Sequence, residues 1–445
     1  MKKGFYRALT SLFVVLAMLV TSAADIPFAD LFVVTASAEA IDVSTWDELY
    51  TALNALSSGS TAEYNIKADL TDTNNKGYLP INKSVIVTLN LNGHTLNRNR
   101  TTSALNGSVI IMSSASRLTI NGDGGKITGG NTSSTKGGGG IFVDSRAVLT
   151  LNNVTIEGNT ATGNGGGIYF NGGQLYIYDS SITRNTAQIG GGIYHIANSV
   201  YLTNVSITEN TPTGYQSQTS FSAWLVVSGN TNVDNIRISP STSYQLRRSE
   251  ALTTGAELLV HITGTNSLPN STKSVPIGQS FTEEDLKYLH SDQDYAFGLK
   301  KEGSYTNLYI GVPVTVTLSQ DNATTAGTTS FTAIYNCMIP TITVPERTGY
   351  TFDGYFDAAE GGTQYYNADG TSTKDWDKSS DTTLYAHWTA NTRTVSFDSQ
   401  GGSSVASQTV NYNAKATKPT DPTKTGYTFG GWYKESGCTN AWNFS

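Results

Sequence analysis

The stretch LTLNNVTI at residues 149–156 recurs as LYIYDSSI at 175–182 and as VYLTNVSI at 200–207. The copies are offset by 26 and 25 residues, and each is accompanied by a glycine cluster that leads into a second short apolar run (GGGIFV, GGGIYF and GGGIYH). One such unit of two strands and two turns cannot bury its own apolar face, whereas stacked units share a continuous core. The repeat therefore predicts a solenoid of strands, with neighbouring coils about 4.8 Å apart.

Strand alternation sets the expected register of these coils, because successive side chains point to opposite faces. The apolar residues at equivalent places in the three copies should point inward. These inward positions are Leu151, Ile177 and Leu202 on one strand, Ile156, Ile182 and Ile207 beyond the bend, and Ile141, Ile168 and Ile193 after the glycine clusters.

The turns repeat as well: Asn159, Asn185 and Asn210 recur in GNTA, RNTA and ENTP. Asparagine tolerates left-handed backbone, and stacked amides can hydrogen-bond from coil to coil. Looser copies of the unit lie on both sides, so we expect at least six coils between Ile81 and Ile262.

These coil motifs resemble the right-handed parallel β-helix family that includes pectate-lyase-like proteins. The glycine clusters and the Asn-Thr-Ala turns also look like the repeats of bacterial polymorphic surface adhesins. The resemblance covers about 180 residues. It implies an architecture rather than an activity, since that fold carries lyases, hydrolases, adhesins and inert spacers alike.

A second repeat lies near the C-terminus, where TGYTFDGYF at 348–356 matches TGYTFGGWY at 425–433 at an offset of 77. The first copy closes with LYAHW at 384–388, whereas the second stops at Ser445 before such a strand, which suggests a fragment or a truncated product. The pattern resembles the internalin-type B repeat, a small β-grasp-like module of bacterial surface proteins. The resemblance implies a repeat stalk.

The N-terminus has the pattern of a secretory signal, with basic residues before an apolar run and small residues after it. We expect cleavage after Ala38, with Ala24 and Ala40 as the alternative sites, and no membrane span in the mature chain. An uncleaved anchor is the other interpretation. The formal net charge of −7 makes nucleic acid an unsuitable partner. The two cysteines, Cys337 and Cys438, occupy non-equivalent places in the tail repeats, and we expect no structural role for them.

The predicted fold class is all-β: a right-handed parallel β-helix solenoid with an N-terminal helical cap, followed by small β-grasp-like repeat domains. The cap is indicated by the amphipathic segment TWDELYTALNALSS from Thr45, and FTEEDLKYLHSD from Phe281 is a second short helical signature. The expected divisions are a signal peptide at 1–38, a cap at 39–80, the β-helix at 81–262, a C-terminal cap and linker at 263–311, the first B repeat at 312–390 and the second at 391–445.

An enzyme of this class would need acids converging on one face, as general acid and base or as calcium ligands. Only five acids lie between Ile81 and Asn210, and we align no two of them at one coil position. The five histidines lack metal-ligand spacing, and the glycine clusters lead into strands without a Lys-Ser/Thr element. We therefore predict no catalytic residues, no metal and no cofactor. The five acids are Asp123, Asp144, Glu157, Asp179 and Glu209.

Two outward ladders of aromatic residues are the candidate binding sites. The first comprises Phe142, Tyr169 and Tyr194, and the second, on another strand, Tyr176 and Tyr201. Flat rings in a row can stack on sugars or anchor a protein partner. The alternative is that the ladders only stabilise the stacking of coils or pack under a loop.

These features together predict a secreted bacterial cell-surface protein of the adhesin type. It would bind a glycan or a host or neighbour-cell surface protein through a β-helix displayed on a repeat stalk, with cell-wall association possible. The alternatives are a polysaccharide lyase or glycoside hydrolase of the β-helix class, and a passive structural spacer.

Overall fold

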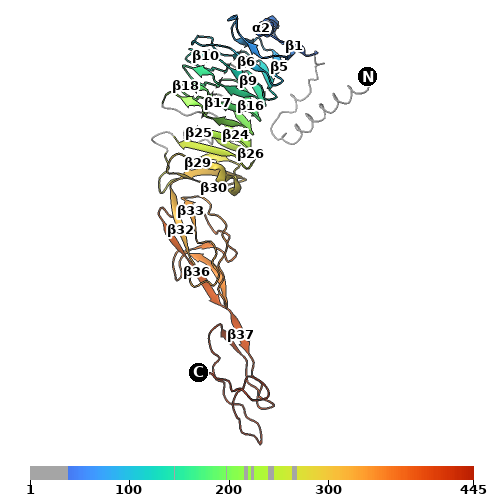
Figure 1. Cartoon of the computed structure of the whole chain (residues 1–445). Helices are drawn as coiled ribbons and strands as arrows, with labels where there is room; N and C mark the ends of the chain where they lie inside the picture. The colour runs from blue at the N-terminus through green and yellow to red at the C-terminus, as the bar shows by residue number, and fades with distance from the viewer. Residues whose placement is uncertain are drawn as a thin grey trace, which may run out of the picture.

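The structure is a computed structural model that describes residues 39–144, 146–196, 198–214, 219–221, 225–238, 245–262 and 268–445. The predicted signal peptide at 1–38 lies outside the described residues. Three stacks of parallel strands form a β-helix, and two smaller β-rich units follow it along the chain (Figure 1). The all-β fold class with parallel coils is thus confirmed.

The coil that begins at Val148 has four strands: β12 (Val148–Asn152) in the first stack, β13 (Thr155–Glu157) and β15 (Ile168–Phe170) in the second, and β14 (Thr160–Ala161) in the third. The first stack holds twelve strands. In order they are β1 (Ile41–Val43), β2 (Thr61–Ile66), β5 (Ile86–Asn90), β8 (Arg117–Asn121), β12, β16 (Gln174–Tyr178), β20 (Val200–Thr203), β24 (Leu225–Gly229), β26 (Leu246–Leu252), β28 (Val275–Gln279), β31 (Tyr305–Gly311) and β30 (Ala296–Glu302).

The second stack holds fifteen strands, in two halves that are joined by β25 (Asn232–Ile238). One half contains β3 (Leu70–Thr71), β6 (Thr95–Asn97), β9 (Lys126–Thr128), β13, β17 (Ser181–Thr183), β21 (Ser206–Thr208), β27 (Glu257–Ile262) and β29 (Leu289–Ser291). The other contains β23 (Thr219–Phe221), β19 (Ile193–His195), β15, β11 (Ile141–Val143), β7 (Ile110–Met112) and β4 (Leu79–Ile81). The third stack is short: β10 (Asn131–Thr132), β14, β18 (Thr186–Ala187) and β22 (Thr211–Pro212).

The predicted register of the coils is confirmed. Leu151 pairs with Ile177 and Ile177 with Leu202, while the isoleucines at the other two inward positions align in the same way. All nine side chains are at most 1% exposed and belong to one apolar cluster. Removal of this apolar surface from water is the main force that holds the coils together.

The turn asparagines form a buried asparagine ladder, Asn159–Asn185–Asn210. The Asn185 amide nitrogen donates to the Asn210 side-chain oxygen at 3.0 Å, and the Asn159 amide donates to that of Asn185 at the same distance. The three residues are at most 3% exposed. The ladder thus satisfies backbone groups that the turn would otherwise bury without partners.

The parallel pairing continues outside the predicted limits of 81 and 262, since β1 already pairs with β2, and β28 still pairs in parallel with β26. Helix α2 (Trp46–Ala55) covers the first coil with Trp46, Leu49 and Leu53 and begins with a capping box. A buried ion pair of Asp72 and Arg98, each 4% exposed, joins the first coils.

The other end of the β-helix closes by a change of strand direction. β31 pairs antiparallel with β28 and β30, so no further parallel coil can follow on that stack. The segment from Phe281 forms the 3-10 helix η2 (Glu283–Tyr288). Such closure protects an edge that could otherwise pair with another chain.

The first tail repeat is a five-stranded mixed sheet in which β36 (Thr382–Ala390) lies between β32 (Pro313–Ser319) and β34 (Tyr350–Phe356). β33 (Ser330–Ile334) and β35 (Gln364–Tyr366) form its edges. In the second repeat only β37 (Thr392–Val395) and β38 (Gln408–Asn411) pair, and no described strand takes the place of β36. A cavity of about 550 Å³ remains there, and Trp442 is 38% exposed whereas its counterpart Trp376 is fully buried.

The expectation that Cys337 has no structural role is wrong. Its side chain is buried with Tyr309 of β31 and Ile334 of β33, and the backbone N–H of Met338 donates to the Leu299 carbonyl at 2.6 Å. Burial raises the pKa of Cys337 to about 12. This cysteine therefore packs the junction between the β-helix and the first repeat, while Cys438 is exposed and both thiols are free.

Candidate ligand-binding surface of the β-helix

The first aromatic ladder lies on the outer side of β11, β15 and β19, in the predicted register. The ring centroids of Phe142 and Tyr169 are 5.0 Å apart and those of Tyr169 and Tyr194 are 5.5 Å apart, with nearly parallel planes. Tyr169 is only 4% exposed, and burial raises its pKa. The central ring of this ladder therefore offers little surface to a ligand.

The glycine-rich loops explain part of this burial. A Cβ atom added to Gly138 would lie 2.8 Å from the Cα of Phe142, and one added to Gly165 would lie 2.2 Å from the Ile168 carbonyl oxygen. Both glycines have positive φ, 78° and 68°. Only glycine permits this close approach of the loop to the strand, so the clusters are structural turns, as the sequence indicates.

The second ladder lies on the outer face of β16 and β20 and is larger than predicted. The rings of Tyr176 and Tyr201 stack with centroids 4.9 Å apart, and the ring of Tyr178 is nearly parallel to that of Tyr176, with centroids 6.5 Å apart. All three side chains are half-buried. We call Tyr176, Tyr178 and Tyr201 the tyrosine cluster. Tyr178 could have been found from the sequence, because residues i and i+2 of one strand share a face.

Polar ladders extend this face toward the N-terminus. Asn65, Asn90, Asn121 and Asn152 form a chain of side-chain hydrogen bonds of 2.8–3.0 Å, and Asn152 lies beside Tyr178 in the strand register. Burial raises the pKa of Tyr178. The face is thus regular and polar up to the point where the tyrosines begin.

A groove that the sequence does not reveal follows the corner between the first and second stacks. It encloses about 490 Å³ and is lined by polar residues from consecutive coils. Its central contacts are the Asn204 side-chain amide donating to Asp179 at 2.9 Å and the Asn230 backbone N–H donating to Asn204 at 2.9 Å. Asn153, Asp179 and Asn204 all have positive φ, which turns the chain at each corner. We call this feature the corner groove.

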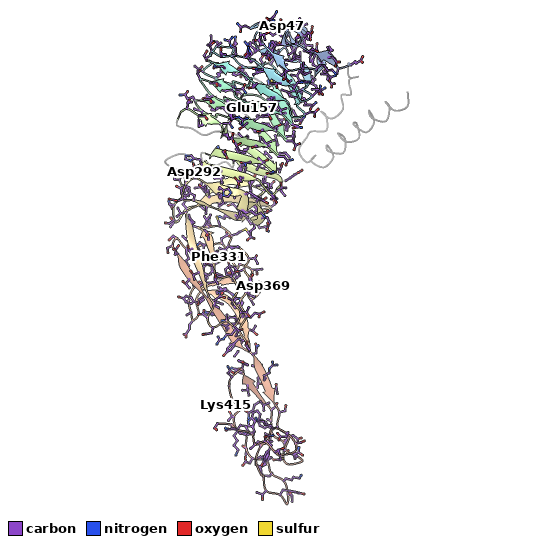
Figure 2. The ribbon with its side chains drawn as sticks, viewed as in Figure 1. Asp47, Glu157, Asp292, Phe331, Asp369 and Lys415 are labelled. Carbon is purple, nitrogen blue, oxygen red and sulfur yellow. The ribbon has the colours of Figure 1, made fainter. Side chains whose placement is uncertain are left out.

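The acids of the coils are mostly held in ion pairs. Glu157 lies 2.8 Å from Lys126 and also contacts Arg184, and these partners, Lys126 first, hold the pKa of Glu157 below its usual value. Arg184 also forms an exposed cross-coil ion pair with Glu209 at 3.5 Å. Figure 2 labels Glu157 in the β-helix, with Phe331, Asp369 and Lys415 in the tail units.

Asp144 pairs with Lys136 at 3.1 Å, beside the first aromatic ladder. Within the described ranges, no group of three or more histidine, cysteine, aspartate and glutamate side chains could hold a metal ion. In the same part of the chain, no helix is both long and apolar enough to cross a membrane.

Comparisons with known proteins match both repeat systems. The model of the Listeria-Bacteroides repeat domain matches residues 315–387 and 394–445, and that of the Chlamydia polymorphic membrane protein repeat matches 153–171. The resemblances to B repeats and to polymorphic surface proteins are thereby supported. No solved structure matches the chain.

Curated relatives are similar over 117 residues. Internalin H of Listeria monocytogenes is 39% identical over 26% of this chain and 20% of its own length. A "Putative membrane protein" and a "Putative Gly-rich membrane protein" of Evansella cellulosilytica are 36% and 35% identical, each over 25% of this chain and over 16% and 12% of their own lengths. The chain thus spans a fifth or less of the length of these relatives, whose names are those of an internalin and of two putative membrane proteins.

Proposed function

We propose that this protein is an exported, adhesin-like surface protein that binds glycans through its β-helix. The observation that carries the proposal is the tyrosine cluster. Its three rings are stacked with nearly parallel planes on one sheet face and each is half-buried, so their orientation is fixed before a ligand arrives. Rings held in this way can cover the C–H face of a sugar at a small cost in conformational entropy.

The arrangement of the chain supports display of this surface. The β-helix occupies one end of the structure, and the two tail units follow one after another away from it (Figure 1). At the first junction β31 ends at Gly311 and β32 starts at Pro313, so there is almost no linker between the two bodies. In such an arrangement the repeats act as a stalk and the β-helix as the binding head.

Export belongs to the same proposal. Residues 1–38 have the composition of a signal peptide, and the relatives with membrane and internalin names are consistent with a surface location. Sequencing of the N-terminus of the protein recovered outside the cell should give Glu39 as the first residue. A chain that retains Met1 and stays inside the cell would contradict the export step.

The binding test is a glycan array probed with the purified chain, beginning at Glu39, and with Tyr176→Ala and Tyr201→Ala variants. Each variant should weaken binding about 10–30-fold, roughly 1.4–2 kcal/mol, because it removes one stacked ring. Tyr305→Ala is the matched control, since Tyr305 is 55% exposed on β31, outside the cluster. An empty array, or equal binding by all four proteins, would refute the proposal.

The resemblance to pectate-lyase-like proteins makes a polysaccharide-active enzyme the competing function. In that function, acids from several coils must be free to act on the substrate, whereas Asp144, Glu157 and Glu209 are engaged by basic side chains. Incubation with a polysaccharide panel tests this directly. New reducing ends or unsaturated products would favour the enzyme over the adhesin.

A further inference from the structure

We infer that the corner groove is a sugar-binding subsite that accepts uncharged, hydroxyl-rich units and rejects carboxylated ones. The inference rests on the proposed glycan-binding function and adds a site and a ligand class to it. The groove has the size of a small ligand site, about 490 Å³, and its lining is formed by amide, hydroxyl and carboxylate groups.

The polar groups of the groove are oriented in advance. Asn204 receives the Asn230 N–H on its side-chain oxygen and donates from its nitrogen to Asp179, both at 2.9 Å. These two contacts fix which end of the amide is the donor and leave its second N–H for another acceptor. Ser181 and Ser206 add hydroxyl groups from adjacent coils, which can donate or accept. Mixed donors and acceptors of this kind match sugar hydroxyls.

The charge of the groove is negative. Asp179 is the one ionisable residue of its lining, and it has no basic partner among the described residues. Beyond Asn232 on the same strand lies Asp234, whose pKa is raised by burial and, in addition, by the carboxylates of Glu257 and Glu209. A carboxylate on a ligand would meet this field without a cation to compensate it.

Lys126 on β9 and Arg184 directly after β17 do not cancel this field. Lys126 and Arg184 both contact Glu157, at the far end of the β13 strand from the corner. Their charges are therefore already paired. This arrangement is opposite to what an acidic polysaccharide needs, namely unpaired arginine or lysine.

The groove lies next to the tyrosine cluster along the chain, since its lining residue Asp179 directly follows Tyr178. Tyr178 immediately precedes Asp179, and its carbonyl oxygen accepts hydrogen bonds from the Ser180 hydroxyl at 2.7 Å and from the Asn153 N–H at 3.0 Å. One oligosaccharide can therefore place one unit on the rings and another in the groove.

The test uses the hexasaccharides of cellulose, laminarin and mannan, each beside its form oxidised to carboxylates at C6. Binding to the mature-length chain is measured by calorimetry at low and high salt. We expect at least one neutral hexasaccharide to bind about tenfold or more tighter than its oxidised form. The difference should shrink in high salt, which screens the repulsion.

Asp179→Asn is the decisive variant, because asparagine already occupies the equivalent corners at Asn153 and Asn204 and tolerates the positive φ. It should strengthen binding of the oxidised form until the neutral and oxidised forms differ by about threefold or less. Asp123→Asn is the matched control, an exposed aspartate with φ 49° that does not line the groove. Asp123→Asn should leave the ratio of neutral to oxidised binding unchanged.

Three results would overturn the inference: no binding of any neutral hexasaccharide, equal binding of the oxidised forms, or an Asp179→Asn variant that behaves like Asp123→Asn. Array binding that is lost in Tyr176→Ala, together with a neutral-to-oxidised binding ratio that Asp179→Asn leaves unchanged, would refute the groove alone. An empty array would refute the proposed function as well.

Discussion

Replacement of Asn185 by alanine removes the centre of the buried asparagine ladder. The side-chain nitrogen of Asn185 donates to the carbonyls of Ile156 at 2.9 Å and Thr183 at 3.0 Å, and its oxygen accepts the backbone N–H of Asn159 at 3.0 Å. In the variant the Ile156 carbonyl and the Asn159 N–H remain buried without these partners. Each such group costs about 1–3 kcal/mol, so the coil should lose roughly 2–6 kcal/mol of stability.

Hydrogen exchange of the full chain, followed by mass spectrometry, measures this loss locally. The amides of β13, β17 and β21 should exchange faster in Asn185→Ala by the factor that corresponds to that free energy. Asn152→Ala is the control, because Asn152 is half-buried and its side-chain amide nitrogen donates to the side-chain oxygen of Asn121 at 2.9 Å. It should cost about 0.5–1.5 kcal/mol. Equal protection in the two variants would refute the view that the ladder satisfies buried backbone groups.

Three further predictions follow from buried or paired ionisable groups. Asp72→Ala should destabilise the first coils by about 3–5 kcal/mol, because it leaves Arg98 charged and buried, and hydrogen exchange there should be faster. The double variant Arg98→Met with Asp72→Asn should restore most of the protection. The pKa of Glu157 in the folded chain lies below its value in the unfolded chain, about 4.3. The Glu157 carboxylate therefore stabilises the fold above about pH 4.3, and this stabilisation is lost as the pH falls through the folded pKa. Thermal melts from pH 6 to about pH 3 should therefore fall less steeply for Glu157→Gln. Iodoacetamide at about pH 8 should add one label, on the exposed Cys438, because burial and a pKa of about 12 keep the Cys337 thiol unreactive. Two labels on the folded chain, detected by mass spectrometry, would contradict the packed junction.

The core of the β-helix could be predicted because each inward residue is repeated. Leu151, Ile177 and Leu202 share one place in a unit that recurs at nearly constant length, and alternation then assigns their faces. The first coils escaped this reasoning because their sequences lack the LTLNNVTI pattern, although β1 and β2 pair at an offset of 23 residues and β2 and β5 at an offset of 25. The core register was therefore predicted from the repetition of the unit and not from the strand propensity of single residues.

The candidate site was predicted only in part. The aromatic ladders that contain Tyr169 and Tyr176 follow from the alternation of side chains along each strand. The burial of Tyr169 depends on neighbouring residues whose positions cannot be predicted from the sequence. The ion pair of Glu157 with Arg184 is diagonal, since Glu157 is in register with Thr183. Alignment of equivalent positions therefore missed it.

The corner groove was missed for a similar reason. It arises where positive-φ residues turn the chain in successive coils, and its lining combines residues on both sides of each turn. A pattern of polar residues at turns is typical of any solenoid. Only the path of the backbone brings Asp179 and Asn204 into one groove.

The most direct test of the account is a hydrogen-exchange footprint of the mature-length chain with and without a glycan that binds on the array. Protection should be confined to the β-helix, in β16, β20 and the corner residues from Asn153 to Asn230, and the tail repeats at 315–445 should not change. Protection in the repeats with none in the β-helix would show that the stalk, and not the head, binds the glycan, and would contradict the account.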